Sequence, residues 1–63
     1  MILFRVDTTF TIPEGEFSYS EFVKHVEDAI DILSEKSNRN VDIDDIKIEV
    51  IGNQVNVYYD VHA

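Results

Sequence analysis

The stretch that decides the fold is IKIEVIGNQVNVYYDV, residues 46–61, in which apolar and polar side chains alternate on both sides of Gly52-Asn53. Alternation with a period of two is typical of a β-strand with one buried face. A Gly-Asn pair suits the two-residue turn of a β-hairpin. That turn predicts three apolar pairs on one face: Val50 with Val55, Ile48 with Val57, and Ile46 with Tyr59.

An earlier strand is predicted over residues 2–12. Its even positions are mostly apolar and its odd positions mostly polar; the even ones are Ile2, Phe4, Val6, Thr8, Phe10 and Ile12. Pro13 lacks an amide donor and Gly15 allows the chain to reverse, so the strand is expected to end there.

An amphipathic helix is predicted between this strand and the hairpin. Ser18 is expected to cap it, with Glu21 reaching back to Ser18 and Phe17 packing on Phe22. The side predicted to face the sheet comprises Tyr19, Phe22, Val23, Val26, Ala29, Ile30 and Leu33. His25 and Ile32 are expected at the edge of this apolar side, outside the core. The helix is expected to end around residues 36–38.

These elements predict one α+β domain over residues 1–63, with the order β-α-β-β and one amphipathic helix packed on a three-stranded sheet. The first strand can lie beside the last in an antiparallel sheet, or beside the second through a parallel crossover. The antiparallel order is favoured because it leaves one sheet face open to water, as the polar odd positions of the first strand require.

Composition and charge narrow the classes of function. Thirteen acidic and five basic residues give a net charge of −8. Nucleic acid and anionic membranes are therefore not expected as partners, whereas a basic protein is an expected partner. The absence of cysteine excludes disulfides and thiolate chemistry. Charge enters the apolar N-terminus at Arg5, so neither a signal peptide nor a membrane span is predicted and a cytoplasmic location is expected.

No constellation predicts catalysis, a metal site or a cofactor, so a non-enzymatic protein is expected. Glu21, His25 and Asp28 share one side of the helix, but no second cluster completes a metal site. Residues 38–49 loosely follow the spacing of a calcium loop, yet Ile43 stands where that loop needs glycine. Two cations among many carboxylates likewise do not form a nucleic-acid groove on the sheet, where Lys47 is expected to pair with Tyr58 across strands.

The favoured candidate site is the acidic side of the helix. Its residues are Glu21, Glu27, Asp28, Asp31 and Glu35. Carboxylates in line on a rigid helix could imitate DNA phosphates, which favours an inhibitor or regulator of a nucleic-acid-binding protein. The small size resembles that of phage and mobile-element accessory proteins. The alternative is an acidic side that only keeps the protein soluble.

Self-association into a homodimer is also predicted. The first strand would be roughly 36 Å long and the helix roughly 27 Å, so apolar residues at one strand end, either Ile2 or Phe10 and Ile12, need a cover. A loop over residues 37–45, with Val41 and Ile43, is the alternative cover. Open sheet edges favour continuation across a two-fold axis.

Ile32, Ile51 and Tyr58 are the predicted self-association residues. They support a second hypothesis, a self-assembling scaffold or small-ligand-binding protein that uses the open sheet face. The order of elements along the chain, strand–helix–strand–strand, and the chain length resemble those of the dodecins, which store flavin, but this chain has no tryptophan to stack the ligand. The resemblance therefore implies the topology and not the flavin function.

Overall fold

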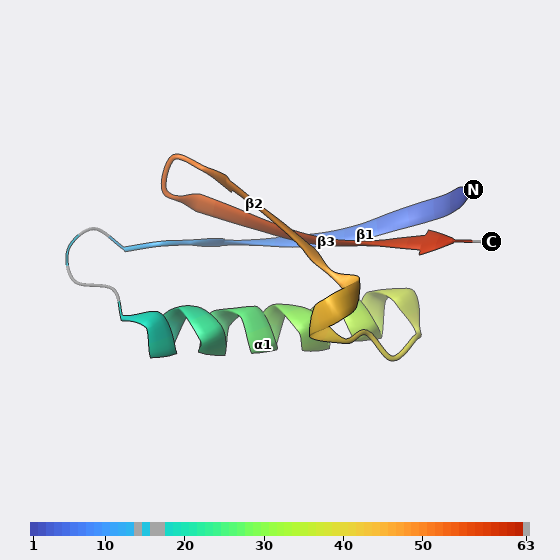
Figure 1. Ribbon diagram of the computed structural model, residues 1–63, viewed down its shortest axis with the longest axis horizontal. Coiled ribbons are helices and arrows are strands. Elements are labelled where there is room, and N and C mark those ends of the chain that lie inside the picture. Colours follow the sequence, from blue (N-terminus) through green and yellow to red (C-terminus); the bar gives the residue numbers. More distant parts are fainter. Residues whose placement is uncertain (14, 16–17, 63) are drawn as a thin grey trace.

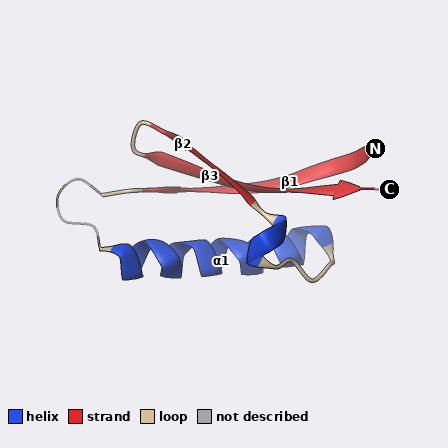
Figure 2. Cartoon of the chain, in the orientation of Figure 1, coloured by secondary structure: helices blue, strands red, loops and turns tan. Residues whose placement is uncertain are grey.

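One helix lies against one face of a three-stranded antiparallel sheet in the computed structural model, which describes residues 1–13, 15 and 18–62 (Figures 1 and 2). The elements in chain order are β1 (Ile2–Thr11), α1 (Tyr19–Ser37), a short 3₁₀ helix η1 (Ile43–Asp45), β2 (Lys47–Ile51) and β3 (Gln54–His62). The sheet order is β1-β3-β2. The predicted α+β fold and the antiparallel order with the last strand central are therefore confirmed.

The β2–β3 hairpin forms around the predicted turn. Gly52 has a φ of 60° whereas Asn53 is not among the residues with positive φ, which is the pattern of a type II′ turn. The ladder pairs Val50 with Val55 and Ile48 with Val57, as predicted. The third predicted pair is wrong, because Ile46 ends η1 and lies before the first residue of β2.

Strand β1 pairs with β3 along nearly its whole length, from Phe4 opposite Val61 to Thr11 opposite Gln54. A register shift between Ile2 and Phe4 sets Ile2 opposite His62. The prediction that Ile2 shares a face with Phe4 is therefore wrong, because the shift inserts an extra residue and reverses the alternation. Ile12, predicted inside the strand, follows it and donates its N–H to the carbonyl of Asn53 at 2.7 Å.

Both ends of α1 are capped by its own sequence. The Ser18 hydroxyl accepts the Glu21 N–H at 3.2 Å, which confirms the predicted N-cap; the predicted packing of Phe17 lies outside the described residues. At the other end Asn38 is left-handed, with a φ of 56°. The Arg39 N–H bonds to the Ser34 carbonyl and the Asn38 N–H to the Glu35 carbonyl, which together form a Schellman motif.

Replacement of the N-cap residue tests how much the local hydrogen bond at the start of α1 contributes to stability. Ser18→Ala is expected to lower the free energy of unfolding by about 1 kcal/mol, because the Glu21 N–H loses its acceptor. Urea denaturation followed by circular dichroism measures the change. Ser18→Asp, which restores an acceptor at the positive end of the helix, serves as the control and should stay close to the wild type; an equal loss in both variants would contradict the capping role.

The core lies between α1 and strands β1 and β3. Its fully buried side chains are Leu33, Val55, Val57 and Val61, joined by the nearly buried Val26, Ala29 and Val41. The predicted sheet-facing side is confirmed for Val26, Ala29 and Leu33 and wrong for Tyr19, which is 81% exposed. The reason is the position of α1, which packs mainly on β1 and β3 and leaves β2 largely uncovered.

The amino-terminal end of β1 is the end that α1 leaves uncovered. Ile2, Leu3 and Phe4 are about half exposed, whereas Phe10 and Ile12 pack against the core. Val41, in the loop after α1, is buried, and its N–H donates to the Ser34 hydroxyl at 3.2 Å. Ile43 in the same region stays 63% exposed, so of the two loop residues predicted to form a cover only Val41 is buried.

Candidate functional site

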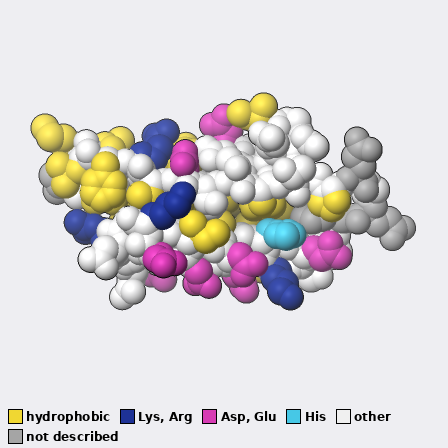
Figure 3. All heavy atoms as spheres, turned by 180° about the vertical axis from the view of Figure 1, so that it is seen from behind, with side chains coloured by type: hydrophobic (Ala, Val, Ile, Leu, Met, Phe, Trp, Pro, Cys, Tyr) yellow, Lys and Arg dark blue, Asp and Glu magenta, His cyan; other side chains and the backbone are white. Residues whose placement is uncertain are grey.

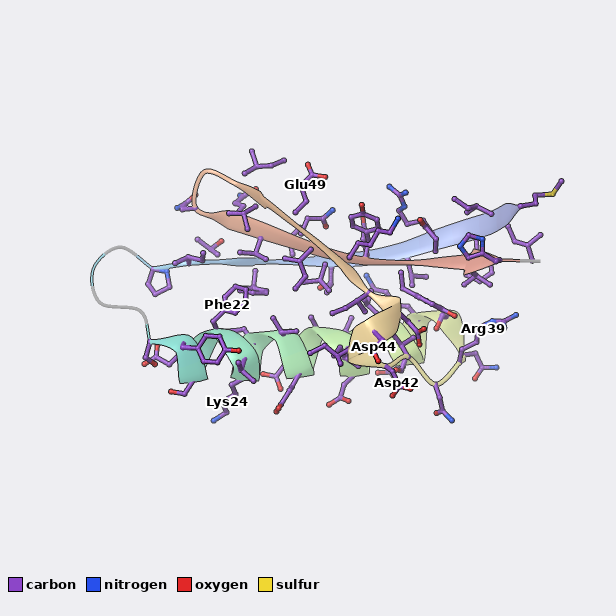
Figure 4. The ribbon with its side chains drawn as sticks, in the orientation of Figure 1. Phe22, Lys24, Arg39, Asp42, Asp44 and Glu49 are labelled. Atoms are coloured by element: carbon purple, nitrogen blue, oxygen red, sulfur yellow. The ribbon has the colours of Figure 1, made fainter. Side chains whose placement is uncertain are left out.

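The acidic helix face comprises Glu21, Glu27, Asp28, Asp31 and Glu35 on the solvent side of α1. All five side chains are exposed. At about 100° per residue they fall within an arc of about 120° opposite Leu33. Figure 3 shows a row of acidic side chains along the helix edge of the molecule. Lys24 lies in the same arc and points away from the sheet, whereas Phe22 points toward it (Figure 4).

None of these five carboxylates forms an ion pair within 4.0 Å among the described residues, although Lys24 shares their arc. The one ion pair within 4.0 Å that the described residues form joins Arg5 and Asp60, on the far side of the sheet. The other helical lysine, Lys36, donates to the carbonyl of Asp7 at 2.8 Å. The acidic helix face is therefore a solvated array of negative charge.

The negative charge continues beyond the carboxyl end of α1. Asp42 and Asp44 are exposed there, and Asp44 lines the same hollow as Arg39. Asp45 has a local role, because its carboxylate accepts the Asp42 N–H at 3.1 Å and so helps to form η1. The loop therefore adds charge at one end of the acidic helix face, with one carboxylate engaged in the turn.

The open face of the sheet is organised around Arg5. Its guanidinium donates to both carboxylate oxygens of Asp60, at 2.6 and 3.2 Å, and lies 4.3 Å from the ring centre of Tyr58. Lys47 pairs with Tyr58 across strands, as predicted. Hydrogen bonding to Arg5 holds the pKa of Asp60 below its ordinary value, while partial desolvation opposes the shift.

Lowering the pH should remove the contribution of this ion pair. The folded-state pKa of Asp60 is below the ordinary value of 3.8, so its stabilisation is complete above about pH 4 and is lost as the pH falls through the folded-state pKa. Asp60→Asn should be less stable than the wild type at neutral pH and equal to it in strong acid. Urea unfolding at a series of pH values measures this; a difference that persists unchanged in acid would contradict it.

The structure does not bring the three predicted self-association residues together. Ile32, 41% exposed, lies on the β1 side of α1 near Thr8 and Asp28. Ile51 and Tyr58 lie on the opposite, open face of the sheet. Tyr58 is also partly covered by Arg5 within the same chain, which leaves Ile51, 66% exposed, as the open apolar side chain of that pair.

His25 has a structural contact that the helical pattern did not reveal. Its ring stacks on Phe10 of β1, with 5.1 Å between ring centres and an interplanar angle of 19°. It stays exposed, as expected, and its ring lies against one face of Phe10, which packs on the core. No group of three metal-ligating side chains that could hold an ion occurs among the described residues.

An apolar groove between α1 and β2 is the surface that sequence reasoning missed. It is lined mainly by Tyr19, Phe22, Val23, Val26, Ile43 and Ile48, with Glu27 at its rim. A helix is about 10 Å wide and strands lie about 4.8 Å apart, so one helix covers two strands. Had the order β1-β3-β2 been combined with this width, the sequence would have predicted that the core-side residues of β2 are not covered by the helix.

Comparison with protein-family models, with curated proteins and with solved structures finds no match for this chain. None of the helices in the described part of the chain has the length and apolar character needed to cross a membrane.

Proposed function

We propose that this protein is a small non-enzymatic inhibitor or regulator that binds a basic, nucleic-acid-binding protein through its acidic helix face. The observation that carries the proposal is the row of five exposed carboxylates on the solvent side of α1, which form no ion pair within 4.0 Å among the described residues and share their arc with a single lysine, Lys24. A basic protein surface that normally holds DNA phosphates is the complementary partner.

The spacing of the carboxylates supports mimicry of DNA. Four of them lie between Glu27 and Glu35, which at 1.5 Å per residue span about 12 Å of helix axis. The mean interval is therefore about 4 Å, close to the 3.4 Å per phosphate along one strand of duplex DNA. An array of this kind would speed association with a basic groove and make binding sensitive to salt.

The rigidity of α1 also supports this role. Caps at Ser18 and Asn38 close both ends, and Val26, Ala29 and Leu33 anchor the opposite side of the helix in the core. The carboxylates therefore stand on a backbone that is ordered before a partner arrives. Preorganisation of this kind lowers the entropic cost of binding.

A pull-down with two matched variants tests the proposal. The first variant, Asp28→Asn/Asp31→Asn/Glu35→Gln, removes three charges from the acidic helix face. The control, Asp7→Asn/Asp42→Asn/Asp44→Asn, removes three charges elsewhere, and Asn at position 42 still suits a cap. The wild type and the control are expected to retain a nucleic-acid-binding protein from a lysate of the source cell or its host, while the first variant loses it.

Salt and competitor DNA complete the experiment. Elution is expected at a few hundred millimolar salt, where the Debye length falls well below about 8 Å, and duplex DNA should displace the partner because both occupy one basic groove. The proposal would be contradicted if both variants retained the partner protein equally, or if excess duplex DNA could not displace that partner. Circular dichroism of both variants checks that the fold is retained.

A further inference from the structure

Strand β2 is an edge strand that is open on both faces. All five of its residues are exposed. Ile48 and Val50 point to the same side of the sheet as the core but are 43% and 56% exposed, because α1 lies over the other two strands. An open apolar edge of this kind is a template for pairing with another strand.

The other edge of the sheet is protected. The Lys36 ammonium donates to the Asp7 carbonyl of β1 at 2.8 Å, so a group that would bond to an added strand is already engaged. A lysine over an edge strand is a common device against unwanted pairing. No side-chain hydrogen bond to β2 is present among the described residues. The two edges are thus unequal, and β2 is the free one.

The turn determines which backbone groups β2 presents at its edge. In a two-residue hairpin Ile51 and Gln54 bond to each other, so Lys47, Glu49 and Ile51 direct their N–H and C=O groups toward β3. Ile48 and Val50 therefore direct theirs outward. Ile46 continues this outward row with an extended backbone, φ −90° and ψ 157°.

Charge complementarity selects one antiparallel register for two copies of this edge. With Ile48 opposite Ile48 of the second copy, Val50 lies opposite Ile46 and the outward groups of all three residues meet. On the open face the same register sets Lys47 opposite Glu49 twice, once on each side of the two-fold axis. A register shifted by one residue in each copy would instead set Glu49 opposite Glu49, which is unfavourable.

We propose that two copies of this chain associate through their β2 edges in this register and form a continuous six-stranded antiparallel sheet with both helices on one face. The occupant of the free edge is thus a second copy. Since the paired strands run antiparallel, η1 of one copy, with its exposed Ile43, lies at the hairpin end of the other.

The surface of the single chain supports this association. It exposes 4686 Å², whereas a compact monomer of its 7.3 kDa mass exposes about 4,200 Å². Its radius of gyration is 12.2 Å, against about 10.6 Å for a compact 63-residue chain. The exposed surface includes the apolar side chains of β2, Ile48, Val50 and Ile51, part of which a partner strand would cover.

Mass measurement with matched lysine substitutions tests the location of the interface. The wild type should show twice the 7.3 kDa chain mass by light scattering. Ile48→Lys should give a monomer, whereas Ile32→Lys makes the same exchange at nearly equal exposure, 41% against 43%, and should remain a dimer. A wild type that stays monomeric at about millimolar concentration overturns the proposal, and so does a dimer that Ile48→Lys leaves intact.

A charge exchange tests the register without altering an apolar residue. Lys47→Glu alone and Glu49→Lys alone each create like-charge pairs on both sides of the axis and should weaken the dimer about tenfold. An equimolar mixture of the two should restore it, because each variant then faces its complement. Lys24→Glu and Glu35→Lys change the net charge equally on the outer helix and should leave the dimer unchanged. A mixture that does not recover overturns the register.

Discussion

Leu33→Ala is expected to lower the free energy of unfolding by about 3 kcal/mol or more. Leu33 is fully buried and packs in a cluster with Ala29, Val55 and Val57. Truncation removes apolar contacts and leaves a cavity that the capped helix and the paired strands cannot close. A chain of 63 residues is expected to have only about 3–9 kcal/mol of total stability, so this variant should lose at least about a third of it.

Ile32→Ala is the matched control for this experiment. It truncates the preceding residue of the same helix, whose side chain is 41% exposed and leaves no enclosed cavity. The expected change is within about 1 kcal/mol. Urea unfolding of both variants, followed by far-ultraviolet circular dichroism, gives the comparison. Similar losses at the two positions would show that the core is not centred on Leu33.

Val57→Thr is expected to cost about 2 kcal/mol. The exchange keeps the size and the β-branched shape of the side chain but places a hydroxyl at a fully buried position in the central strand. A buried hydroxyl without a partner loses its bonds to water, and this loss is the whole of the expected effect. Strand propensity changes little, because valine and threonine both favour strands.

Val50→Thr provides the comparison for the central strand. It makes the same exchange in the neighbouring strand of the hairpin, at a position that is 56% exposed, and in dilute solution should change stability by less than about 0.5 kcal/mol. Thermal or urea unfolding at several low protein concentrations separates this effect from self-association. Equal losses would mean that the hydroxyl is not the cause.

The two proposals about binding can fail independently. The acidic helix face lies on the outer side of α1, and the variants that neutralise it leave β2 unchanged. Conversely, the variants at positions 47, 48 and 49 of β2 keep every carboxylate of the acidic helix face. If both hold, the two-fold axis sets both acidic helix faces on the same side of the sheet, which would extend the negative surface presented to one basic partner.

Local sequence was sufficient for most of the secondary structure. The alternation around Gly52-Asn53 predicted the β2–β3 register, because a two-residue turn allows few pairings. Ser18 and Asn38 mark the two ends of the helix, and each forms its capping hydrogen bond with a residue within four positions in the chain. The acidic helix face was equally readable, since the helical period alone places its carboxylates on one side.

Long-range packing explains what the patterns could not predict. Tyr19 follows the apolar period of α1 and yet stays exposed, because the position of the helix over β1 and β3 depends on side chains from three separate elements. The register shift near Ile2 similarly depends on the pairing of β1 with β3, which lies far along the chain. Periodicity reports which side of an element is apolar and carries no information on what covers it.

The sheet shows most clearly which features follow from the amino-acid sequence and which depend on the tertiary structure. Period-two alternation and a two-residue turn are properties of neighbouring residues, so the amino-acid sequence alone predicts the strands, the hairpin and the apolar face. The unequal edges depend on contacts across the fold: Lys36, on the helix, protects β1, and the limited width of α1 leaves Ile48 and Val50 open on β2. Those contacts join residues far apart in the chain, which is why only the folded molecule reveals the free edge.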